Sequence, residues 1–123
     1  MSIYSGFRTI NIDEGDRRKT DMERGVCSVD VDGLELESVN IKNGRKFEWG
    51  YNGVLPLNLS KSILVHFLNS GNDGTEYEAP DPVVSRFCND FVSKFGFNEW
   101  SLDSDELLKY LNSLYYELYG EKP

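Results

Sequence analysis

Apolar and polar residues alternate in the first half of the chain, which is the pattern of strands that bury one face. We expect a first strand over residues 3–12 and a second over residues 27–31. Asp32-Gly33 is a strong signal for a two-residue hairpin turn, and Leu34 and Leu36 continue the apolar face beyond it.

The alternation changes phase after Glu37, because Val39 and Ile41 then occupy the opposite parity. A bulge near Ser38 would account for this change. Asn43-Gly44 is a second turn signal, and we expect a short strand over residues 46–51 to follow it.

Helical periodicity replaces the alternation in the second half of the chain. We expect one helix over residues 56–71 and a second over residues 81–96, with Asp81 as its N-cap. A third helix is expected over residues 103–120, where Asp103 and an acidic residue three positions later form a capping box.

Strands therefore precede helices, and the fold class that we expect is α+β. A small antiparallel sheet of three to four strands would be covered on one face by about three helices, in a single domain over residues 1–123. Two segments stand outside this pattern, a highly charged loop at 13–25 and an acidic loop at 69–79.

The net charge of −8 indicates which kinds of molecule the protein can bind. An acidic surface repels nucleic acid and anionic lipid, so we expect neither of these and instead a basic protein surface as the partner. No apolar stretch approaches the ~20 residues that a membrane-spanning helix needs. The first six residues lack the basic and apolar runs of a signal peptide, so we expect a cytoplasmic protein.

Catalytic and metal-binding motifs are missing from the sequence, and we expect no enzyme activity, no cofactor and no metal site. The single histidine, His66, lies beside an apolar helix face, where a structural role is expected. Cys27 and Cys88 both fall on apolar faces and are expected to be reduced thiols in the core.

Acidic residues form the candidate partner-binding surface. With Asp32-Gly33 as the turn, Asp30 lies directly opposite Glu35, and like charges in such a pair destabilise a ladder. Either Arg8 or Lys42 on a neighbouring strand neutralises this patch, or a basic partner does. The predicted surface comprises Asp30, Asp32, Glu35, Glu37, Asp73, Glu76, Tyr77, Glu78 and Asp81.

The negative charge of a further acidic tract is largely explained without a binding partner. The tract comprises Glu99, Asp103, Asp105 and Glu106. The last three residues lie at the start of the third expected helix, where the helix dipole favours negative charge.

The segment at residues 47–56 combines three aromatic residues, two glycines and a proline at a strand-to-helix junction. Its simplest interpretation is a well-packed corner. The alternative is a pocket for a small anionic ligand or nucleotide, or an enzyme of unfamiliar type, in which Arg8 clamps a phosphate or carboxylate. The candidate pocket residues are Tyr4, Arg8, Glu48, Trp49, Tyr51 and Asn52.

Two motifs carry a resemblance. The run Phe47-Glu48-Trp49-Gly50-Tyr51 with Gly53, and the opening segment Tyr4-Ser5-Gly6-Phe7-Arg8, resemble the signatures of a bacterial, plasmid and phage family of unknown function. The resemblance implies no activity, substrate or cofactor. It implies a setting on mobile genetic elements.

Size, charge and this setting favour an acidic, non-catalytic interaction protein. The hypothesis is that it inhibits a nucleic-acid-handling host defence complex, in the manner of an anti-CRISPR protein or a DNA mimic, because acidic side chains on a scaffold can stand in for phosphates. The plainer alternative is an accessory protein whose acidity serves solubility alone.

Overall fold

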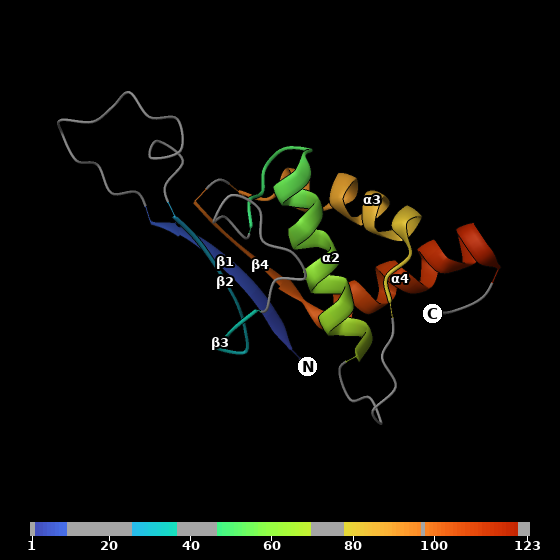
Figure 1. Cartoon of the computed structure of the whole chain (residues 1–123). Helices are drawn as coiled ribbons and strands as arrows, with labels where there is room; N and C mark the ends of the chain where they lie inside the picture. Colours follow the sequence, from blue (N-terminus) through green and yellow to red (C-terminus); the bar gives the residue numbers. More distant parts are fainter. Residues whose placement is uncertain (1, 10–25, 37–46, 70–77, 97, 121–123) are drawn as a thin grey trace.

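The structure is a four-stranded antiparallel sheet with helices packed against one face (Figure 1). This computed structural model describes residues 2–9, 26–36, 47–69, 78–96 and 98–120. The strands are β1 (Ile3–Thr9), β2 (Val26–Val31), β3 (Leu34–Glu35) and β4 (Glu99–Asp103), and the helices are α2 (Val54–Asn69), α3 (Asp81–Asp90), the short 3-10 helix η1 (Val92–Lys94) and α4 (Ser104–Tyr119). The expected α+β class is confirmed.

Strand β1 lies at the centre of the sheet, which has the order β3-β2-β1-β4. Tyr4 lies between Val31 of β2 and Leu102 of β4, and all three side chains are buried beneath the helices. Two positions along β1, Gly6 pairs with Trp100 on β4 and faces the same way. The alternation of the sequence thus becomes a sheet with one covered face and one open face.

The predicted hairpin is confirmed. Asp32 and Gly33 have φ values of 52° and 85°, so both turn residues adopt the left-handed conformation that a type I′ turn requires. The register places Asp30 opposite Glu35, as expected. One apolar expectation is wrong, because Leu36 is buried whereas Leu34 is 74% exposed on the two-residue edge strand.

Two strand predictions differ from the structure. Strand β4 was missed, although Trp100 and Leu102 alternate with three polar residues. The strand expected over residues 46–51 is wrong for its described part, since residues 47–51 form an irregular corner. Gly50 has φ 88° there, and its N–H donates to the carbonyl of Val92 rather than to a strand.

The helices follow the periodicity, with different ends. Helix α3 begins with Asp81 itself and has Pro80 as its N-cap, so the predicted cap is wrong by one residue. It stops at Asp90, because the backbone of Phe91 leaves the helical region before η1 begins. Asp103 is the N-cap of α4 as expected, but its carboxylate accepts from the N–H of Asp105 at 2.7 Å and not from the N–H three positions on that a capping box uses.

Several predictions lie outside the described residues. They concern the continuation of the first strand to residue 12, the loop at 13–25, the bulge near Ser38, the turn at Asn43-Gly44 and most of the loop at 69–79.

Candidate functional site

A buried ion pair joins the central strand to the aromatic corner. Both nitrogens at the tip of Arg8 donate to Glu48, Nη1 to Oε2 at 3.0 Å and Nη2 to Oε1 at 2.5 Å. The two side chains are 0% and 1% exposed. Glu48 also accepts from the backbone N–H of Trp49 at 3.1 Å, so this carboxylate is held by its own corner as well as by β1.

Aromatic rings enclose this pair. The Arg8 guanidinium lies 5.0 Å from the ring centroid of Trp49, within the range of a cation–π contact. Trp49 meets Trp100 edge to face at 5.7 Å, and Trp100 in turn stacks on Phe95 at 4.1 Å. Gly6 makes room for the Trp100 ring, because a Cβ at Gly6 would lie 2.4 Å from the indole nitrogen.

The ion pair is closed to solvent in this state. Burial works to lower the pKa of Arg8, but the hydrogen bonding to Glu48 and the nearby charges of Cys27, Glu48 and Tyr51 together outweigh it and hold the pKa above its ordinary value. An anion could reach the guanidinium only by displacing Glu48 and opening the aromatic cover. The candidate pocket for an anionic ligand therefore stays a prediction that requires the corner to open, and a thermal-shift screen with nucleotides tests it.

The other candidate pocket residues are divided between core and surface. Tyr4 is buried, and its hydroxyl lies 2.7 Å from Nδ1 of His66. Burial, followed by the nearby charge of Asp32, raises the pKa of Tyr4, so the tyrosine stays protonated, and the tautomer of His66 sets which of the two groups donates the hydrogen bond. Tyr51 is 39% exposed, and Asn52 is also exposed although its Oδ1 lies 3.8 Å from the Sγ of the buried Cys88.

The side of the sheet away from the described helices carries acidic side chains from three strands. We call this surface the open face, and its residues are Ile3, Ser5, Phe7, Ser28, Asp30, Glu35, Glu99, Ser101 and Asp103. Strand β1 runs along its middle. Glu99 and Asp103, which the sequence analysis placed in a separate acidic tract, therefore belong to the same surface as Asp30 and Glu35. The alternation around Trp100 was the signal that could have placed them there.

Arg8 does not neutralise the acidic patch, which corrects one of the two alternatives. The β1 register directs its side chain to the covered face, where it is buried against Glu48. Lys42, the other candidate, lies outside the described residues. Within the described strands, Arg8 is the only basic residue, so these strands place no Lys or Arg on the open face.

The remaining predicted acidic residues are only partly described. Asp32 is exposed at the hairpin turn, where it accepts a hydrogen bond from the N–H of Ile3 at 2.9 Å that lowers its pKa. Glu78 and Asp81 are exposed at the start of α3, away from the strands. Glu37, Asp73, Glu76 and Tyr77 lie outside the described residues.

The cysteines are both free thiols. Cys88 is buried as expected, and burial raises the pKa of its thiol, so it is unreactive in the folded state. Cys27 is only half-buried, so the expectation of a fully buried thiol is wrong for this residue. The described residues contain no group of three or more side chains suited to hold a metal ion.

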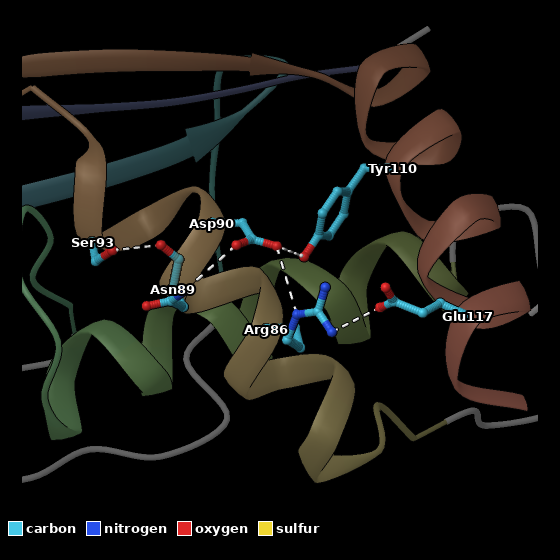
Figure 2. A network of polar contacts seen from close by, with 6 residues as sticks. All are labelled: Arg86, Asn89, Asp90, Ser93, Tyr110 and Glu117. Atoms are coloured by element: carbon cyan, nitrogen blue, oxygen red, sulfur yellow. Dashed lines mark hydrogen bonds and ion pairs between the residues drawn. The ribbon is translucent and has the colours of Figure 1, made fainter.

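A polar network ties α3 to α4 (Figure 2). Tyr110 of α4 donates to Asp90 at 2.7 Å, and Arg86 bonds Glu117 at 2.7 Å. Figure 2 shows that Asn89 of α3 and Ser93 of η1 extend the network. Arg86 is 44% exposed, so this network fixes the contact of two helices at the surface and resembles a structural clamp.

Alkaline pH is expected to destabilise the protein. Burial is the main cause that raises the pKa of Tyr4, Tyr110 and Tyr115 above the ordinary value of 10. The unfolded chain then ionises before the folded one, so the stability that these groups contribute is complete below pH 10 and is lost as the pH rises through the folded-state values. Urea unfolding between pH 9 and pH 11.5 measures this fall. Tyr110→Phe should make it shallower, and a flat profile would contradict the prediction.

Fold and sites together define a small α+β protein with a sealed aromatic corner and an acidic open face. The profile of DUF6166, a family of unknown function, matches residues 14–113, so the chain belongs to that family. The match includes the signature at 47–51 and begins after β1. No curated protein and no solved structure matches the chain significantly. Among the helices described, none has the length and apolar character needed to span a bilayer.

Proposed function

We propose that this chain is a non-catalytic interaction protein whose open face binds a basic surface of a partner protein. The observation that carries the proposal is the register that places Asp30 directly opposite Glu35, so that two carboxylates lie side by side on the open face. A basic side chain of a partner complements two adjacent carboxylates.

The same face extends the charge beyond the hairpin. Glu99 and Asp103 lie across β1 from β2, so acidic side chains occupy both flanks of the central strand. The net charge of −8 adds a longer-range attraction for a basic surface.

The finer form of the proposal concerns the kind of partner. We take it to be a nucleic-acid-handling complex of a host defence system in the cytoplasm, inhibited because the acidic face occupies a basic groove. This form is supported by the acidic surface and by the resemblance to proteins of mobile elements. It predicts that nucleic acid and this protein compete for the same complex.

Charge reversal tests the proposal. Asp30→Lys with Glu35→Lys is expected to reduce recovery of a basic complex in a tagged pull-down by at least tenfold, while stability stays the same or rises slightly. Recovery should also fall steeply between low and high salt, since exposed charges are screened. Excess DNA should displace the protein.

The matched control is Asp105→Lys with Glu106→Lys, which changes the net charge equally on the exposed side of α4. This variant should keep most of the recovery. Equal losses in the two variants would mean that only total charge matters, and unchanged recovery after reversal at Asp30 and Glu35 would reject the open face as the binding surface.

A further inference from the structure

Two apolar side chains lie in the middle of the acidic open face. Ile3 is 38% exposed and Phe7 is 46% exposed, and both project from β1. Their neighbours on the same face across the ladders are serines and acids, which cannot cover them as a helix would. A solvent-exposed phenylalanine within a charged surface is the composition of a protein-binding site.

The strand register gives this face a defined layout. Phe7 lies between Ser28 on β2 and Glu99 on β4, and Ile3 lies beside Asp103. Between them, Ser5 is flanked by Asp30 on one side. The face is therefore an apolar line along β1 with small residues beside it and negative charge on both flanks.

The dimensions of this layout match those of an α-helix. Ile3 and Phe7 are four strand residues apart, a span of about 13 Å at ~3.3 Å per residue. Residues seven or eight apart on a helix are separated by about 11–12 Å along its axis. The two flanking strands are each ~4.8 Å from β1, so together they are about 10 Å apart, close to the diameter of a helix with its side chains.

The negative charge of the open face determines which kind of molecule can bind there. A second copy of the chain would place its own Asp30, Glu35 and Glu99 against the same residues, with like charges opposed. Nucleic acid would be repelled for the same reason. A helix with an apolar stripe flanked by lysine or arginine satisfies both the apolar line and the two acidic flanks.

We infer that the open face binds a basic amphipathic helix of the partner protein, which lies along β1. Its apolar stripe packs on Ile3 and Phe7, and its basic side chains reach Asp30 and Glu35 on one flank and Glu99 on the other. This inference rests on the proposed function and deepens it, because it names the structural element that the acidic face recognises.

A pair of synthetic peptides provides the probe. One is an α-helical peptide of about 18 leucine and lysine residues with its leucines on one face, and the other has the same composition in scrambled order. Each is titrated into the isotopically labelled protein at physiological ionic strength and followed by NMR. The amphipathic peptide is expected to bind at least tenfold more tightly and to shift the amide signals of β1 and β2.

Matched variants locate the contact. Phe7→Thr keeps a residue that favours strands and should weaken binding of the amphipathic peptide at least tenfold. Tyr116→Gln removes an apolar side chain that is 55% exposed on α4 and should leave the affinity unchanged. Circular dichroism confirms that both variants are folded. Ile3→Thr is the second test of the apolar line and should also weaken binding.

Each contrary outcome is distinct. Equal affinity for the two peptides would mean that the face recognises charge alone, and signal shifts confined to the helices would place the site elsewhere; either result overturns the inference. Self-association of the free protein through β1 would make a second copy the occupant and overturn it too. If charge reversal at Asp30 and Glu35 abolishes recovery of the natural partner but Phe7→Thr does not, the bound helix is rejected. The proposed function then still holds.

Discussion

Replacing Arg8 with methionine is expected to lower the free energy of unfolding by about 3–5 kcal/mol. Methionine keeps most of the length and apolar contact of the side chain but leaves the carboxylate of Glu48 buried without its cation. A buried charge that loses its partner is costly because water cannot solvate it. The loss is a large fraction of the 5–15 kcal/mol that is typical of a domain. Urea unfolding followed by tryptophan fluorescence measures it.

The double variant Arg8→Met with Glu48→Leu separates charge from packing. Removing both charges should recover a large part of the lost stability, because well-packed apolar residues often replace a buried ion pair without loss. Arg86→Met is the surface control, since its partner Glu117 is 59% exposed, and it should cost less than about 1 kcal/mol. A small loss in Arg8→Met, or a double variant worse than both single variants, would contradict this account of the corner.

Gly6→Ala is expected to destabilise the protein toward the upper end of about 1–3 kcal/mol. The new Cβ would lie 2.4 Å, 2.5 Å and 2.8 Å from three atoms of the Trp100 indole. The indole cannot easily move away, because it stacks on Phe95 and meets Trp49 at its edge. A single methyl group therefore disturbs the whole aromatic cover.

A coupling measurement checks the cause. In a Trp100→Leu background, the additional cost of Gly6→Ala should fall by more than 1 kcal/mol, since the clash is gone. Ser5→Val is the control on the same strand, because it enlarges a side chain on the open face instead of the covered face and should change stability by less than about 0.5 kcal/mol. Equal costs of Gly6→Ala in both backgrounds would show that backbone effects, and not the indole, are responsible.

The hairpin and the helices were predictable because their signals are local. Asp32-Gly33 specifies a turn that only residues tolerant of positive φ can form, and the register of Asp30 and Glu35 follows from it directly. The apolar spacing of α2 and α4 likewise depends on residues within a few turns. The ends of α2 and α4 differ from the expected ones by one or two residues, whereas α3 stops at Asp90, six residues before its expected end.

The site was less predictable because it depends on contacts between distant residues. Arg8 and Glu48 are forty positions apart, and nothing in either local pattern shows that they form a pair. The sequence analysis named both as candidate pocket residues, but it predicted that Arg8 binds a ligand or neutralises the acidic patch. The short strand β4 was missed because five residues of alternation next to a helix are a weak signal. For the same reason, Glu99 and Asp103 were not assigned to the open face.

The position of β1 has a consequence for the order of events during synthesis. This central strand needs both neighbours, and the β4 residues that pair with it are made roughly 90 positions later. At 5–20 residues per second, β1 waits roughly 5–18 seconds for its second partner. Through that interval one edge of β1 is unpaired, so the nascent chain is most exposed to aggregation and to chaperones before residue 103 appears.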